Sequence, residues 1–173
     1  LLVVMKNFNI IVIVVLVIVA IFGIVIALQP SEAHLEKSII INAPASAIFP
    51  EVSRYKNFNA WSPWSKMDPG VKQTYEGEDG TIGSKMNWDG PKSGTGSQWI
   101  VEIEENKRVK NGMSFGGDEG TFYSEFILEP DGEGTKVTWT YDGPNNGLIG
   151  KATWIVMGAM LSSQYDMGLR DLK

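Results

Sequence analysis

An uninterrupted apolar run near the N-terminus, residues 10–28, is the feature that most constrains this chain. It reads IIVIVVLVIVAIFGIVIAL and contains no charged or strongly polar side chain. At a helical rise of about 1.5 Å per residue, the run extends roughly 28 Å, close to the ~30 Å hydrocarbon core of a bilayer. We therefore expect residues 10–28 to form a single transmembrane anchor that follows a short flank, residues 1–9.

A cleaved signal peptide is the alternative for this run. The apolar core of a signal peptide is usually ~7–15 residues long, and Ser31-Glu32-Ala33 is only a weak match to a small-x-small cleavage site. The length of the run favours the anchor. Lys6 is the only flanking cation, which predicts a cytoplasmic N-terminus and a following domain on the outer, periplasmic or extracellular, side. The chain does not begin with Met, so either Met5 is the true start or the sequence is a fragment.

Charge and composition after the run exclude several classes of function. All 20 acidic residues but only 14 of the 15 basic residues follow the run, which leaves that part at −6. This balance argues against nucleic acid and against docking on anionic lipid. There is no cysteine, and the only histidine, His34, lies in the expected linker, residues 29–35. Thiolate sites and His-based triads or metal sites are therefore excluded from the domain, and we expect neither metal nor cofactor.

The rest of the chain has the pattern of one α+β domain. We predict strands over residues 36–44, 71–77, 84–90, 97–105, 108–115, 121–130 and 135–143, with a short helix over 44–55. The segment EPDGEGT predicts a hairpin between the last two strands. Asn111-Gly112 also resembles a turn, but its flanks are short, so we expect a bulge there. Residues 55–70, which hold Trp61 and Trp64, read as a loop.

The last two strands alternate between apolar and polar residues, and a long helical pattern covers residues 149–172. One face carries Phe122, Ser124, Phe126 and Leu128 from one strand and Val137, Trp139 and Tyr141 from the next. This predicts an antiparallel sheet of six to seven strands with one dry face. The long C-terminal helix and two short helices are then needed to cover that face.

The order of these segments, together with particular residues, resembles a known family. The stretches are SIIINAPASAIFPEVS, NFNAWSPWSKMDP and FILEPDGEGTKVTWTYDGPNN, followed by a C-terminal helix that ends in GLRDLK. They are similar to the polyketide cyclase/dehydrase branch of the START-like, or SRPBCC, superfamily, over residues 36–173. The resemblance implies the helix-grip fold, in which a curved antiparallel sheet grips the long helix around a deep apolar cavity.

The resemblance also implies a class of function. Members bind hydrophobic ligands such as lipids, sterols and polyketides, and a minority catalyse cyclisation or dehydration. No catalytic motif is shared across the superfamily, so no catalytic residue is assigned here. We expect a membrane-tethered domain that binds a hydrophobic small molecule or lipid, a binding protein rather than an enzyme. The alternatives are an enzyme that uses a carboxylate or a tyrosine, Tyr141 first, and a non-catalytic interaction module with a closed cavity.

The candidate cavity residues are large apolar side chains on the expected dry face and helix. They are Trp61 and Trp64 from the loop, Trp88, Met113, Phe122, Phe126, Trp139 and Tyr141 from the sheet, and Met157, Met160 and Leu161 from the helix. Methionine suits an adaptable apolar pocket. A filled core is the alternative for each of them, and a purely structural plug is favoured for at least one of Trp61 and Trp64. The face of Trp99 is ambiguous because both faces of its strand carry apolar residues.

The polar residues are weaker candidates for contact with a ligand. Asp142, Asn145 and Asn146 lie between the last strand and the long helix, where turn and capping roles are favoured over ligand contact. Two acidic groups, Glu76, Glu78 and Asp79 in one and Asp118 and Glu119 in the other, are interpreted as solvated surface charge.

Overall fold

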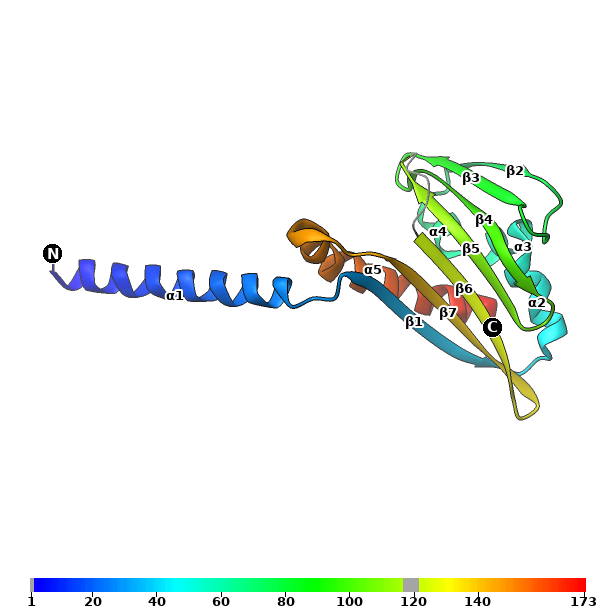
Figure 1. Cartoon of the computed structure of the whole chain (residues 1–173), viewed down its shortest axis with the longest axis horizontal. Coiled ribbons are helices and arrows are strands. Elements are labelled where there is room, and N and C mark those ends of the chain that lie inside the picture. The colour runs from blue at the N-terminus through cyan, green and yellow to red at the C-terminus, as the bar shows by residue number, and fades with distance from the viewer. Residues whose placement is uncertain (1, 117–121) are drawn as a thin grey trace.

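The structure, a computed structural model, describes residues 2–116 and 122–173. One long helix extends away from an α+β domain in which a second long helix lies along a curved sheet (Figure 1). The elements are, in chain order, α1 (Leu2–Ala27), β1 (Glu32–Ile41), α2 (Ala45–Ser53), α3 (Tyr55–Trp61), α4 (Pro63–Met67), β2 (Lys72–Glu76), β3 (Lys85–Gly90), β4 (Gly94–Glu104), β5 (Arg108–Phe115), β6 (Phe122–Asp131), β7 (Gly134–Pro144) and α5 (Gly147–Leu172).

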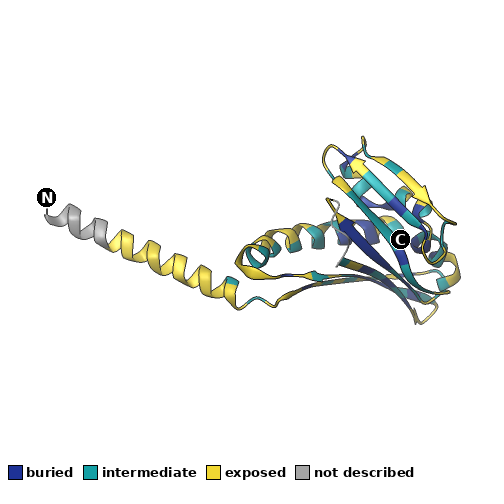
Figure 2. Cartoon of the chain, turned by 45° about the horizontal axis from the view of Figure 1, so that its top comes forward, coloured by how far each residue is buried: buried dark blue, intermediate teal, exposed yellow. Residues whose placement is uncertain are grey.

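The apolar run forms a helix that is long and apolar enough to cross a membrane over Ile10–Ala27. Its side chains are exposed on every side from Ile10 to Val25 (Figure 2). A helix with apolar side chains all round needs an apolar environment, which a bilayer supplies. A signal sequence near an N-terminus can also meet this criterion of length and composition.

All seven strands belong to one antiparallel sheet in the order β1-β7-β6-β5-β4-β3-β2. Neighbours in the sheet are neighbours in sequence except at β1, which pairs with β7, so Lys37 lies opposite Trp139. Buried residues gather on the sheet face toward α5 (Figure 2), and the predicted alternation is confirmed, with Val137, Trp139 and Phe126 buried there. The predicted helix-grip fold is thus confirmed.

The first strand begins earlier than the sequence indicated. We expected it at residue 36 after a linker over 29–35, but β1 begins at Glu32. Its first residues pair with the end of β7, where Glu32 lies opposite Pro144 and Leu35 opposite Tyr141. Because that partner lies more than 100 residues away in sequence, the local pattern could not reveal the pairing.

The tryptophan-rich segment is helical, so the expected loop over residues 55–70 was wrong. α3 begins where the backbone N–H groups of Tyr55 and Lys56 donate to the Asp79 carboxylate at 2.7 and 3.3 Å. Pro63 then opens α4, the position at which a proline is well tolerated. The cap of α3 comes from a residue 24 positions away. Asp79, interpreted as surface charge, therefore has a structural role.

The irregularity expected at Asn111-Gly112 lies instead on the neighbouring strand. The register shifts between Ile100 and Glu102 of β4, so β4 carries the extra residue and β5 stays regular. Asn111 therefore keeps its place in the inward alternation of β5, between the buried Val109 and Met113.

Trp139 lies at the centre of the core. Its ring stacks on Tyr165 of α5 at a centroid distance of 3.8 Å and an interplanar angle of 10°, and on Phe126 of β6 at 4.8 Å. Its indole N–H donates to the Ser124 hydroxyl at 2.8 Å. Trp61 of α3 approaches the same ring edge-on at 5.7 Å. One side chain therefore joins the sheet, the long helix and the short helices.

The fit of α5 onto this centre requires a glycine. A Cβ at Gly168 would lie 2.8 Å from Trp139 Cζ3 and 3.0 Å from Pro63 Cδ. At Gly150, earlier in α5, the nearest atom to a Cβ would be 3.6 Å away, an ordinary contact.

We predict that Gly168→Ala lowers the free energy of unfolding by up to about 2 kcal/mol. Overpacking costs about 1–3 kcal/mol, and the gain in helix propensity of roughly 1 kcal/mol offsets only part of it. Gly150→Ala, the matched control, should be neutral or up to about 1 kcal/mol more stable. Urea unfolding of the full chain in nanodiscs, followed by tryptophan fluorescence, measures both. Equal stability of the two variants would show that the contact at Gly168 is loose.

Candidate functional site

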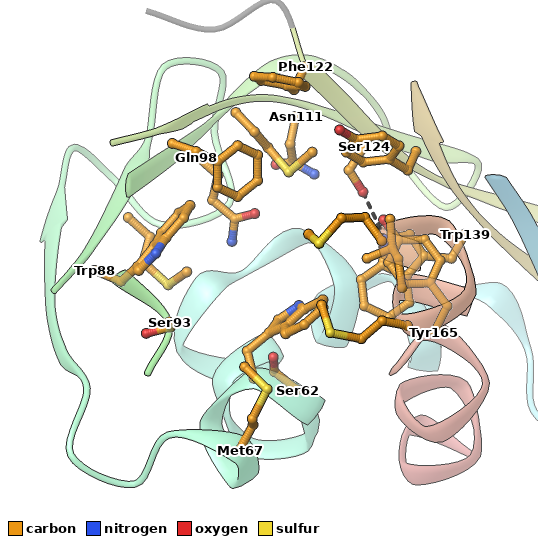
Figure 3. Close-up of a pocket in the computed structure, with 18 of the residues that line it drawn as sticks. Ser62, Met67, Trp88, Ser93, Gln98, Asn111, Phe122, Ser124, Trp139 and Tyr165 are labelled. Carbon is orange, nitrogen blue, oxygen red and sulfur yellow. Dashed lines mark hydrogen bonds between the residues drawn. The ribbon is translucent and has the colours of Figure 1, made fainter. Parts of the chain in front are cut away.

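A cavity of about 620 Å³ lies between the inner face of the sheet and α5, with α3 and α4 closing one side (Figure 3). This volume is within the range of about 300–1,000 Å³ that is typical of small-molecule sites. All the predicted cavity residues except Trp61 line it: Trp64, Trp88, Met113, Phe122, Phe126, Trp139, Tyr141, Met157, Met160 and Leu161. The fold thus brings them around one space, while their contact with a ligand stays a prediction.

The two tryptophans of the α3–α4 segment have different places. Trp61 is buried beside Phe58 and Trp139 rather than on the cavity wall, and its N–H donates to the carbonyl of Glu51 at 3.0 Å. Trp61 is therefore a core plug, as was favoured for at least one of the pair. Trp64 is the second residue of α4 and lines the cavity. Trp99 lies on the outer face of the sheet, with its ring over Gly112.

A band of aromatic rings crosses one end of the cavity. Trp88 approaches Phe115 at 5.7 Å, Phe115 approaches Phe122 at 5.3 Å, and Phe122 stacks on Tyr141 at 6.2 Å. Tyr141 in turn stacks on Trp154 of α5 at 5.4 Å. The band therefore runs from β3 across the sheet to the long helix and gives this end an apolar wall.

A glycine allows the first ring of this band to lie on the sheet. A Cβ at Gly96 would lie 2.2 Å from Trp88 Cζ2, so no other residue fits opposite Trp88 without moving the ring. Two members of the band, Phe115 and Trp154, were not among the predicted cavity residues. The sequence pattern could have identified both. Phe115 continues the alternation of Asn111 and Met113, and Trp154 lies one helical turn before Met157.

Uncharged polar groups line the inner part of the cavity, and sequence reasoning missed them. Gln98 and Asn111 point inward from β4 and β5 (Figure 3). The Asn111 side-chain oxygen accepts a hydrogen bond from the Tyr55 hydroxyl at 2.8 Å. The hydroxyl oxygen of Ser62 is buried without a hydrogen-bond partner among the described residues. Asn111 was overlooked because Asn-Gly resembles a turn.

The ionisable groups of the cavity stay uncharged at neutral pH, apart from one lysine. Burial, reinforced by the nearby Asp142, raises the pKa of Tyr141 to about 12. Burial, with Asp79 second, also raises the pKa of Tyr55 well above its usual value. Both phenols therefore keep their protons and can donate hydrogen bonds. Among the described lining residues, none is Asp or Glu, and Lys92 is the only formally charged one.

Asp68 holds one rim of the cavity. It is buried after α4, and its carboxylate accepts hydrogen bonds from the N–H groups of Lys92 and Ser93 and from the Ser93 hydroxyl, at 2.8–2.9 Å. The Ser93 backbone N–H is the largest of the contributions that hold the pKa of Asp68 below its usual value. Lys92 and Ser93 line the cavity, so Asp68 fixes the β3–β4 hairpin against the short helices.

The polar connection before α5 has a structural role. Asn145 donates from its side chain to the carbonyl of Pro30 and from its backbone to the carbonyl of Ser31. Asp142 accepts from His34 at 2.7 Å. Asn146 precedes α5 without a side-chain cap. Of the two acidic groups, Asp118 and Glu119 lie outside the described residues.

The sequence of this chain is similar to a known protein family, and its fold is similar to those of known proteins. The model of the family described as polyketide cyclase / dehydrase and lipid transport matches residues 32–173. The Aha1 dimer from Colwellia psychrerythraea is 17% identical, with a TM-score of 0.61 over 82% of this chain and 93% of that chain. A protein from Rhizobium leguminosarum is 18% identical, with a TM-score of 0.57 over 82% and 91%. Protein MLL2253 from Mesorhizobium loti is 12% identical, with a TM-score of 0.59 over 81% and 93%. These structural likenesses show the fold alone. No curated protein sequence matches the chain.

We predict that Asp68→Asn destabilises the domain at pH 7 and that this difference shrinks in acid. Because the folded-state pKa is lowered, the carboxylate stabilises the fold above its unfolded pKa of about 3.9, and this contribution is lost as the pH falls through the folded value. Urea midpoints at pH 7 and pH 3.5 for both proteins measure it. A destabilisation of the same size at both pH values would show that the charge of Asp68 contributes nothing.

Proposed function

We propose that this chain, which belongs to the polyketide cyclase/dehydrase and lipid transport family, is a membrane-tethered domain that binds a hydrophobic small molecule or lipid. The observation that carries the proposal is the cavity of about 620 Å³ with its wall of aromatic and methionine side chains. A folded domain normally fills its interior to crystal-like density, so an unfilled apolar space of this size indicates a ligand.

The polar groups of the cavity lining limit the kinds of ligand that can bind. Gln98, Asn111 and Ser62 offer hydrogen bonds deep in the cavity, and no described lining residue carries a negative charge. A charged ligand group beside these three residues would lose its hydration without a paired charge, which is costly, because Lys92, the only charged lining residue described, lies at the rim held by Asp68. An apolar body with a small uncharged polar group, such as a hydroxyl, carbonyl or ester, fits this lining.

The tether is the second part of the proposal. α1 is long and apolar enough to cross a membrane. It would hold the domain beside a bilayer and raise the local concentration of lipid ligands. From Lys6 we propose that the N-terminus is cytoplasmic and that the domain lies on the outer side.

The residues that line the cavity give less support to a catalytic function. A carboxylate base or acid has no candidate among the described cavity residues, and the raised pKa of Tyr141 keeps that phenol from acting as a base near neutral pH. The open volume likewise argues against an interaction module whose cavity has closed.

The direct test is native mass spectrometry of the full chain, purified from its own membranes and released from nanodiscs, with organic extraction of bound molecules. We expect a stoichiometric apolar adduct. A clean apo mass, together with no uptake of the probe described next, contradicts the binding function.

We predict that Met160→Asp weakens uptake of an apolar probe about tenfold, or about 1.4 kcal/mol. A carboxylate on the cavity wall would have to be desolvated by the ligand, which opposes binding. Met167→Asp is the matched control, because both methionines lie on α5 with 43% exposure and only Met160 lines this cavity.

The probe is a short, water-soluble monoacylglycerol with a brominated chain, titrated into the full chain in nanodiscs. Bromine in the cavity would quench the lining tryptophans, which include Trp64, Trp88 and Trp139. The control variant should bind within twofold of the unmodified chain. Identical quenching curves for all three proteins would assign the signal to lipid adsorption outside the cavity.

A further inference from the structure

The end of α1 is fixed to the beginning of α5. The Asn145 side chain donates to the carbonyl of Pro30 at 3.0 Å, and its backbone N–H donates to the carbonyl of Ser31 at 2.8 Å. The Lys151 ammonium donates to the carbonyl of Ala27, the last residue of α1, at 3.1 Å. Only residues 28–31 separate α1 from β1. Figure 1 shows the first turns of α5 beside the end of α1, at the end of the domain that is nearest α1. If α1 spans a bilayer, these turns lie at its surface.

The first turns of α5 expose an apolar surface at this place. Leu148, Ile149 and Val156 are 65%, 85% and 70% exposed, and we call these three residues the α5 patch. Leu28, just after α1, is also largely exposed. Contiguous exposed apolar surface on a folded domain marks an interaction site. The α5 patch therefore continues the apolar surface of α1 onto the domain.

The composition of this part of α5 suits a membrane surface. Lys151 is the only charged residue between positions 147 and 161, whereas Asp166, Arg170 and Asp171 follow in the other half of the helix. A lysine whose stem lies along apolar surface, with a tryptophan such as Trp154 one turn away, is typical of the boundary between hydrocarbon and water. The domain is acidic overall, so attraction to anionic lipid does not supply the contact.

The same turns of α5 border the cavity, and we place its mouth there. Gly150, Thr153, Trp154 and Met157 line the cavity from this half of the helix. Met157 is also 46% exposed, so its side chain belongs both to the cavity wall and to the outer surface. A surface that inserts at the α5 patch would thus place the mouth against the same bilayer.

The geometry points to a lipid-docking surface: the α5 patch inserts into the bilayer beside α1 and opens the cavity onto it, so that an uncharged lipid enters from the membrane without crossing bulk water. This inference rests on the proposed function, since it requires both the tether and a cavity that binds lipid. It adds the surface that docks and the source of the ligand.

The absence of cysteine allows a site-specific test. Ile149→Cys and, as control, Ile40→Cys each receive one environment-sensitive dye in the full chain, reconstituted in phosphatidylcholine vesicles. Ile40 is also exposed, at 53%. It lies eight residues along β1 from Glu32, the β1 residue nearest α1 in sequence, which places it roughly 26 Å along the strand from that residue. We expect the dye at position 149 to shift to shorter emission wavelength and to be quenched by lipids with doxyl-labelled chains. The dye at position 40 should show neither effect.

A second measurement ties docking to ligand entry. The double variant Ile149→Ser/Val156→Ser changes two residues outside the cavity lining. We expect it to take up a long-chain brominated monoacylglycerol from vesicles about tenfold more slowly than the unmodified chain. Its affinity for the water-soluble short-chain analogue should be unchanged.

The outcomes separate this inference from the proposed function. If position 149 is quenched no more than position 40, or if the double variant takes up membrane lipid at the unmodified rate, the docking surface is refuted while binding of the short-chain probe still stands. A dye at position 149 that is shielded from water but not quenched by doxyl lipid would replace the bilayer with a second copy or another protein. Loss of the chain from vesicles in alkaline carbonate would refute the tether itself, and failure of the short-chain probe to bind would refute the cavity function.

Discussion

The stack of Trp139 on Tyr165 is the contact on which the rest of the domain depends. It joins the sheet to the long helix at 3.8 Å, and both rings are almost fully buried. The polar atoms of both residues are satisfied, the indole N–H by Ser124 and the Tyr165 hydroxyl by the carbonyl of Thr140 at 3.3 Å. Because aromatic pairs contribute about 0.5–1.5 kcal/mol beyond their area, and because Gly168 permits the approach, this one contact fixes where the end of α5 lies.

Fixing α5 at its C-terminal half leaves its N-terminal half less deeply buried. The buried residues of α5 are Tyr165, Gly168 and Leu169, all in the second half of the helix. The first half borders the cavity, where Trp154 stacks on Tyr141 of the sheet. The domain therefore has a packed end and an open end. The open end is the one beside α1, so the position of the core decides that the cavity faces α1.

What the sequence could predict is set by the range of the interactions involved. The inward alternation of β6 and β7 and the helical spacing from Trp154 to Leu172 are local periods, so the fold and several of the large apolar cavity residues could be predicted. The cap of α3 by Asp79 and the pairing of Glu32 with Pro144 join distant segments, so α3 and the start of β1 were missed. Asn111 was missed for another reason: its strand was predicted, but a bulge was expected at Asn111-Gly112, and a bulge interrupts the alternation that assigns a residue to one face.

If α1 anchors the domain in a bilayer, weak insertion of the α5 patch is enough to dock it. Full burial of an aliphatic side chain contributes about 1.5–3 kcal/mol, so three partly inserted side chains would give a free domain only weak affinity for a bilayer. A linker of four residues between α1 and β1 makes the second contact intramolecular, at high effective concentration, and weak docking is then sufficient. Weak docking also permits the patch to leave the bilayer, which a domain that moves lipid into or out of its cavity requires. A larger or more apolar patch would hold the mouth permanently against the membrane.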